Sequence, residues 1–212
     1  MVGVAFIDLG AEVILSGDDF DASKLAAREY AQEIQARFVE DGAESSIAEG
    51  AGTIGVELAR AVPDLDSLLV PLGNGAPLAG VGAAFRHHCP ATRIIAVVAE
   101  QAPSMKLSLD QGVVVQTEIA NTIADGVAVR IPIPEALAAL QHRFDSVLSV
   151  SEDQIRRAML LILEHLAIAV EPAGALGVAA MLSQPDQFFS QSVATILCGA
   201  NLKSGLLRQI VG

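Results

Sequence analysis

The sequence predicts an α/β protein built on an open, mostly parallel sheet with helices on both faces. Short apolar runs rich in β-branched residues alternate with segments of helical periodicity along most of the chain. Two of the runs, 67–72 and 93–100, are apolar over most of their length, which is typical of strands buried on both faces of a parallel sheet. This alternation of strand and helix defines the class.

The first forty residues are expected to contain two short strands around one helix. The runs 10–17 ("GAEVILSG") and 36–40 ("ARFVE") predict the strands. Between them, Asp19 to Asp21 offer caps for a helix that continues to about Gln35.

The remaining elements follow in alternation. Ser151 is expected to cap a long helix, and Pro172 to begin a helix of small residues. The segment 101–134 is expected to be looser. Helices are predicted over 52–61, 78–88, 135–143, 152–166 and 172–182 and near the C-terminus, with strands over 67–72, 93–100, 145–151 and 192–197.

Composition excludes several classes of function. The 212 residues carry 25 acidic and 13 basic side chains, and this net charge of −12 would repel nucleic acid. Two cysteines, Cys89 and Cys198, cannot make a disulfide framework. Residues 1–4 lack the basic region of a secretory leader, so we do not expect secretion. No apolar stretch reaches the roughly 18 residues that a membrane span needs. We expect a cytoplasmic protein that binds neither membrane nor nucleic acid.

The stretch "VPLGNGAPLAG", residues 70–80, is the most informative one. A turn poor in side chains that enters a helix exposes backbone N–H groups to a phosphate, and the helix dipole favours the anion. A tight turn without a ligand is the alternative. Gly73 and Gly75 also match the first two glycines of the dinucleotide fingerprint, with Glu100 where a ribose-binding acid might lie, but Leu78 takes the place of the third glycine.

Seven blocks, in order along the chain, show a resemblance to a known family. They are similar to the threonine/serine dehydratase and serine racemase group of fold type II pyridoxal-phosphate enzymes. Each block alone is weak, whereas seven in the family's order over about 200 residues are specific. The blocks are "GAEVILSGDDFDAS", "AEGAGTIGVEL", "VPLGNGAPLAG", "TIADGVAV", "VSEDQIRRAML", "EPAGALGVAAML" and "ILCGAN".

The resemblance implies a pyridoxal 5'-phosphate site. The family's tetraglycine phosphate loop falls on Gly73, Asn74, Gly75 and Ala76. Ala76 must adopt an ordinary backbone conformation for this loop to survive. The residue that meets the pyridine nitrogen falls on Cys198, a neutral thiol that does not force that nitrogen to be protonated. Both stretches follow predicted strands, so a single site at one edge of the sheet is expected.

The family's Schiff-base lysine and its substrate-carboxylate loop have no counterpart here. None of Lys24, Lys106 and Lys203 has the expected S-x-K-x-R-like context. We therefore expect a truncated chain without a catalytic base, inactive in isolation, in which residues 1–43 are a remnant of the small domain and 44–212 are most of the large domain. No metal is expected, because Lys106 falls where some relatives carry the second of two acids.

The resemblance implies an ammonia-lyase that converts a hydroxy amino acid such as serine or threonine to a 2-keto acid and ammonia, in a homo-oligomer that we expect to be a dimer. A degenerate, non-catalytic binding or partner protein is the alternative, followed by a dinucleotide-binding domain. Two further residues stay open. Asp125 is a turn former that would line the site in the functional interpretation, and Glu171 either caps a helix or lies near the cofactor ring.

Overall fold

Four parallel strands form the centre of the computed structural model, which describes residues 6–202 and 205–211. The strands are β1 (Ser67–Pro71), β2 (Arg93–Ala99), β3 (Ser146–Val150) and β4 (Val193–Thr195). They lie in the order β3-β2-β1-β4, and every neighbouring pair is parallel. The predicted open parallel sheet is confirmed.

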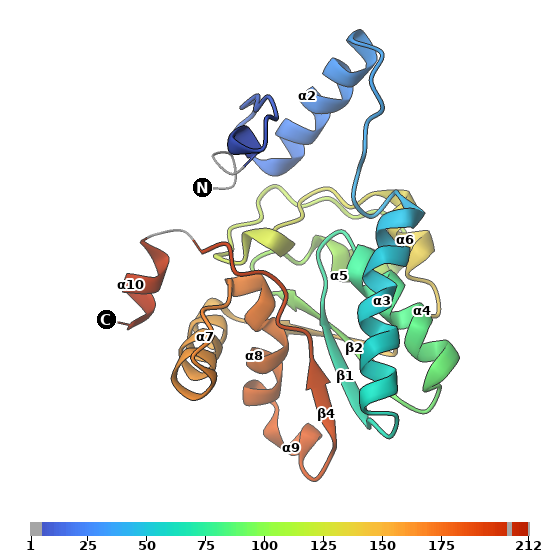
Figure 1. Cartoon of the computed structure of the whole chain (residues 1–212), viewed down its shortest axis with the longest axis vertical. Coiled ribbons are helices and arrows are strands. Elements are labelled where there is room, and N and C mark those ends of the chain that lie inside the picture. The colour runs from blue at the N-terminus through green and yellow to red at the C-terminus, as the bar shows by residue number, and fades with distance from the viewer. Residues whose placement is uncertain (1–5, 203–204, 212) are drawn as a thin grey trace.

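Helices cover both faces of this sheet. Leu69 of β1 faces a core that it shares with α7 (Glu152–Leu166) and α8 (Leu176–Ser183). The next residue along the chain, Leu68 on the other side of the pleat, faces a second core shared with α3 (Ser45–Ala61) and α4 (Ala76–His88). Figure 1 shows the two helical layers on either side of the strands.

The helices begin where the sequence supplies caps. Asp19 accepts the Ala22 N–H at 2.7 Å and starts α2 (Phe20–Glu33). Ser151 and Gln154 form a reciprocal capping box at the start of α7. Pro172 opens the short helix η2 (Pro172–Ala175), which runs into α8. The other helices are α5 (Ser104–Gln111), η1 (Asp125–Val127), α6 (Pro134–Ala139), α9 (Pro185–Phe188) and α10 (Leu206–Val211).

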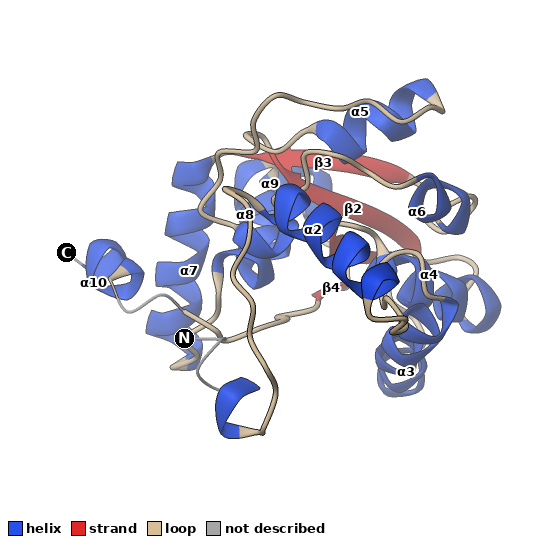
Figure 2. Cartoon of the chain, turned by 90° about the horizontal axis from the view of Figure 1, so that it is seen from above, coloured by secondary structure: helices blue, strands red, loops and turns tan. Residues whose placement is uncertain are grey.

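Helix α2 stands apart from the two layers. Figure 1 shows it beyond one end of the sheet, joined to α3 by an extended segment, and Figure 2 shows it crossing above the strands. The buried Asp21 ties it to the body of the protein, because its carboxylate accepts the backbone N–H groups of Arg130 and Ile131 at 3.1 and 3.3 Å.

The structure differs from the sequence-based prediction in four places. The strands predicted over 10–17 and 36–40 are wrong, since neither segment pairs with another strand in the described chain. A strand needs a neighbour for its backbone N–H and C=O groups. Helix α3 begins at Ser45 rather than near residue 52, and α5 occupies part of the segment predicted to be loose. Among the helices that the structure describes, none combines the length and the apolar character required to cross a bilayer.

Candidate cofactor-binding site

Strands β1 and β4 carry the two predicted loops to the same edge of the sheet. They are parallel neighbours, with Leu69 opposite Thr195. Gly73 follows shortly after the end of β1, and Cys198 follows shortly after the end of β4. The structure therefore brings together the two stretches for which the sequence predicts one site.

The phosphate-loop candidate, Gly73 to Ala76, is a tight turn into α4. Gly75 is the N-cap residue with φ +93°, a backbone conformation in which a side chain is strained. Gly73 packs so closely that a Cβ there would lie 3.0 Å from the carbonyl oxygen of Gly126. Ala76 is the first residue of α4 and does not have a positive φ. Ala76 therefore has the ordinary backbone conformation that the phosphate loop requires of it.

The backbone N–H groups of this loop have no acceptor among the residues that the structure describes. All four residues are buried. None of their N–H groups donates a hydrogen bond to an acceptor in the described part of the chain. Buried N–H groups are almost always paired, so four in succession at a helix N-terminus indicate a place for an external acceptor. Such an array suits a phosphate group.

Asn74 replaces a glycine of the family's loop and makes a contact of its own. Its side-chain amide donates to Oδ1 of Asp41 at 3.0 Å, while its Oδ1 is buried without a partner among the described residues. The neighbouring Gly42 packs against the loop, since a Cβ there would lie 2.6 Å from the Asn74 carbonyl oxygen. Asp41 and Gly42 thus hold the outer side of the loop.

Cys198 is half-buried at the end of the segment that follows β4. Burial raises the pKa of its thiol above the ordinary value, and the nearby Glu171 carboxylate raises it further. Glu171 does not cap η2 with its side chain; its Oε2 accepts the N–H of Asn201 at 3.2 Å instead. Glu171 is thus the N-cap residue of η2 by position, and its backbone carbonyl accepts the Gly174 N–H at 3.0 Å, but its side chain makes no capping hydrogen bond.

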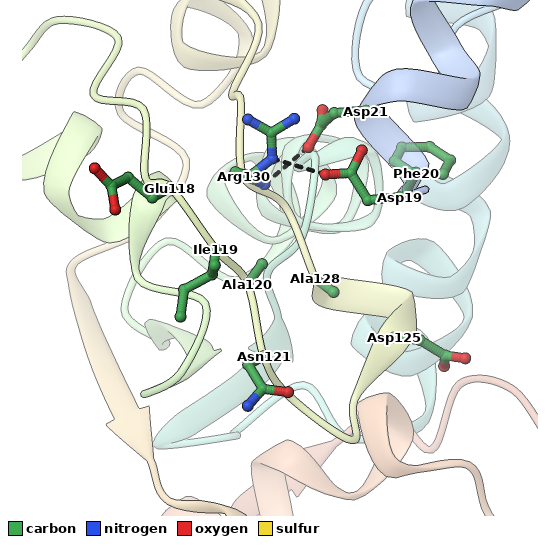
Figure 3. Close-up of a pocket in the computed structure, with 10 residues that line it drawn as sticks. All are labelled: Asp19, Phe20, Asp21, Glu118, Ile119, Ala120, Asn121, Asp125, Ala128 and Arg130. Carbon is green, nitrogen blue, oxygen red and sulfur yellow. Dashed lines mark hydrogen bonds and ion pairs between the residues drawn. The ribbon is translucent and has the colours of Figure 1, made fainter. Parts of the chain in front are cut away.

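A cavity of about 490 Å³ lies between the start of α2 and the segment 118–130. Figure 3 shows Asp19 and Asp21 directed towards Arg130, with Glu118 to Asn121 along another wall. Asp19 pairs with the Arg130 guanidinium at 2.8 Å. Asp125 also lines this cavity, whose walls include none of the predicted cofactor-binding residues, so a place for Asp125 in the cofactor site stays a prediction. The next residue, Gly126, is the one that packs on Gly73.

The lysines that the structure describes are both engaged by carboxylates. Lys24 has a side chain that is 9% exposed, and its ammonium lies 3.3 Å from Asp21 and 3.3 Å from Glu40. Lys106 pairs with Asp110 within α5 at 2.5 Å. Lys203 lies outside the described residues. Within those residues, no group of three or more His, Cys, Asp or Glu side chains is placed to hold a metal ion.

Reasoning from the sequence missed two residues at this edge. Asp41 lies in an acidic loop with no recognisable signal, and only the fold places it against Asn74. Gly126 belongs to the quoted block "TIADGVAV", but nothing in the sequence assigns it a neighbour. The structure packs it against both Gly73 and the Glu171 side chain, with Oε1 of Glu171 3.4 Å from a Cβ built there.

An open parallel sheet with N–H groups that lack an acceptor among the described residues, at the carboxyl end of a central strand, is typical of α/β proteins that bind an anionic ligand at that edge. The model of the family described as "Pyridoxal-phosphate dependent enzyme" matches residues 6–199. The chain belongs to this family.

Curated relatives and solved structures agree with this family assignment. The L-threonine ammonia-lyase of Geobacter sulfurreducens is 37% identical over 195 residues, which are 92% of this chain and 48% of that protein. The L-threonine ammonia-lyase of Thermotoga maritima is 34% identical, over 96% of this chain and 51% of its own. The chain thus spans about half the length of these relatives.

Among solved structures, the processed form of threonine deaminase isoform 2 from Solanum lycopersicum matches with a TM-score of 0.91 and 29% identity, over 98% of this chain and 58% of its own. Maize serine racemase matches with a TM-score of 0.84 and 28% identity, over 95% of this chain and 63% of its own. These matches confirm the resemblance that the sequence blocks carry.

Proposed function

We propose that Gly73 to Ala76 bind the phosphate of pyridoxal 5'-phosphate and that Cys198 faces the pyridine nitrogen. The observation that carries the proposal is the row of four N–H groups, on buried residues, that find no acceptor in the described chain, at the edge of the sheet where Cys198 also lies. A phosphate would supply the missing acceptors. The cofactor, when bound, supplies an electron sink for a carbanion next to the amino group of a substrate.

The residues of this chain would bind the cofactor, orient its ring and shield it from water. The loop amides would hold the phosphate, and the thiol would offer a neutral partner to the ring nitrogen. Gly126 and Glu171 lie between these two groups along the same edge, so the ring would lie across them. We propose that residues 44–212 form most of a cofactor-binding domain and that 1–43 belong to a smaller one, consistent with the separation of α2 in Figure 1.

For the whole protein we propose an ammonia-lyase that acts on a hydroxy amino acid, since the relatives reported above carry the name threonine ammonia-lyase. For this chain by itself we propose no turnover, because both described lysines are held by carboxylates. Incubation with threonine or serine and the cofactor should yield no 2-keto acid. Borohydride reduction should trap no stoichiometric adduct on Lys24, Lys106 or Lys203, and a stoichiometric adduct on any one of them overturns this part of the proposal.

Cofactor binding is tested by titration of the protein with pyridoxal 5'-phosphate, followed by absorbance and by retention on a desalting column. Ala76→Glu places a carboxylate on the buried loop and should weaken binding by about tenfold or more, because the anion site then carries a like charge. Pro77→Glu is the matched control, since Pro77 is the exposed next residue of the same turn. Retention of NAD in place of pyridoxal 5'-phosphate would favour the dinucleotide alternative.

Loss of binding in Ala76→Glu counts only for a folded variant, so its urea unfolding is compared with that of Pro77→Glu. Inorganic phosphate provides a second readout on the unmodified chain, because it should compete for the same amides. Binding that is insensitive to millimolar phosphate contradicts the assignment of the loop.

We also propose that the chain self-associates. Large apolar side chains are exposed over the first forty residues, with Leu9 85% and Leu15 92% accessible. Light scattering tests this, and a monodisperse monomer contradicts it.

A further inference from the structure

Glu171 joins two segments at the carboxyl edge of the sheet. Its backbone N–H donates to the carbonyl oxygen of Gly199 at 3.2 Å. Its carboxylate accepts the N–H of Asn201 at 3.2 Å. One residue at the start of η2 therefore holds the turn that follows Cys198 through both its backbone and its side chain.

Two of the glycines around Glu171, Gly174 and Gly199, have no space for a Cβ atom. A Cβ at Gly199, which has φ +83°, would overlap the carboxylate group of Glu171. A Cβ at Gly126 would approach Oε1 of Glu171 from the other side, at 3.4 Å. At Gly174 a Cβ would overlap the carbonyl oxygen of Cys198. The carboxylate is thus packed between Gly126 and Gly199, and η2 is packed on the Cys198 backbone.

The charge of Glu171 acts on the Cys198 thiol. A carboxylate beside a half-buried thiol disfavours the thiolate, because the two negative charges repel in a partly desolvated place. Its effect on the pKa of Cys198 adds to that of burial. Helix η1, which packs against η2, carries one further ionisable side chain, Asp125.

We propose that Glu171 is a positioning residue with two tasks: it fixes the Gly199–Asn201 turn, and it keeps Cys198 a protonated thiol. The proposal rests on the role of Cys198 proposed above and deepens it. A thiol can donate its S–H to an unprotonated ring nitrogen, whereas a thiolate cannot donate. Together with burial, the carboxylate thereby favours the protonated form in which Cys198 would meet the cofactor.

The test needs no cofactor. The rate of alkylation of Cys198 by iodoacetamide is measured between pH 6 and 10.5, with mass spectrometry of the peptides separating Cys198 from the buried Cys89. Because the thiolate is the reactive form, the midpoint of the profile reports protonation and the high-pH plateau reports accessibility. A purely structural role for Glu171 would move the plateau alone.

Glu171→Gln removes the charge and keeps an acceptor for the Asn201 N–H. It should lower the midpoint and raise the rate at pH 8 by roughly threefold to tenfold, with the plateau unchanged within about twofold. Glu171→Ala should lower the midpoint and also raise the plateau, because the turn loses its anchor. An unchanged midpoint in Glu171→Gln overturns the charge task, and an unchanged plateau in Glu171→Ala overturns the anchoring task.

Two further variants make the comparison specific. Glu57→Gln removes an exposed carboxylate from α3, on the opposite face of the sheet from η2, and should leave the profile of Cys198 as in the unmodified chain. Asp125→Asn should shift the midpoint less than Glu171→Gln, and a larger shift would reassign the charge effect to Asp125. Failure of the cofactor titration with an intact shift in Glu171→Gln would refute the proposed function and leave this inference standing.

Discussion

The side-chain amide of Asn74 donates to the carboxylate of Asp41 at 3.0 Å, so the candidate phosphate loop is tied to the turn before α3. A glycine at this position could not make the contact. The pair links residue 74, in the loop at the end of β1, to residue 41, in the segment that leads from α2. Movement of that segment is thereby coupled to the loop.

A double-mutant cycle should detect this coupling. Asp41→Ala leaves the buried Asn74 amide without its acceptor and should lower the free energy of unfolding by about 1–3 kcal/mol. In an Asn74→Gly background the same change should cost less, with a coupling energy of about 1 kcal/mol. Urea unfolding of the four proteins measures it, and strictly additive losses would show that the contact contributes nothing.

Gly75→Ala should destabilise the protein by about 1–2 kcal/mol or more, because an alanine at φ +93° is strained and its Cβ would also lie 3.0 Å from Leu140. Gly50→Ala is the contrasting change, in the exposed interior of α3 with open space around the new Cβ. It should stabilise the protein by about 0.5–1 kcal/mol. Thermal unfolding followed by circular dichroism compares the two, and equal effects would contradict the conformation assigned to Gly75.

Asp21→Ala should release α2 while leaving the sheet intact. The buried carboxylate accepts two backbone N–H groups and pairs with Lys24, so its removal leaves the ends of all three interactions unsatisfied. Limited trypsin digestion should then cut faster within α2 and the segment after it, at Arg28 and Arg37, while the peptides of β1 and β2 stay protected in hydrogen exchange. Unfolding of the sheet together with α2 would contradict this division.

Asp19 gives α2 a dependence on pH. The Ala22 N–H, followed by the Arg130 side chain, lowers the pKa of its carboxyl below the ordinary value of 3.8. Because the folded-state pKa is the lower one, the contribution of Asp19 to stability is present above the unfolded-state pKa and is lost as the pH falls through the folded-state pKa.

Asp19→Asn keeps the cap and removes the charge. The unmodified chain should be more stable than this variant at pH 6, and the difference should shrink as the pH falls below the ordinary carboxyl value of 3.8. Thermal melts at 222 nm over this range measure it. A difference that persists unchanged at low pH would show that the charge of Asp19 has no part in it.

Local signals in the sequence predicted the sheet and most helices. The apolar runs at 67–72 and 93–100 became β1 and β2 because both faces of a parallel strand are covered, and Asp19, Ser151 and Pro172 start helices as their side chains dictate. The runs at 10–17 and 36–40 have the same local character, but strand formation depends on a neighbouring strand, which a local pattern does not reveal.

The same limit holds at the site. The bare loop Gly73 to Ala76 was visible in the sequence because its composition is unusual. These contacts join residues that are 33 or more positions apart in the chain: Asp41 with Asn74, and Gly126 with Gly73 and with Glu171. Such neighbours are set by the course of the whole backbone. Glu171 before Pro172 looked like a capping residue, and only the fold shows its carboxylate turned to Asn201.

The enclosure of Lys24 also bears on experiments with aldehyde reagents. Surface amines form adventitious imines with such compounds, and the fraction of each side chain that solvent reaches governs which amine reacts. Lys24 offers 9% of its side chain, wedged among carboxylates, whereas Lys106 offers 32%. Of these two residues, Lys106 is therefore the one expected to form the non-specific imine that colours the protein.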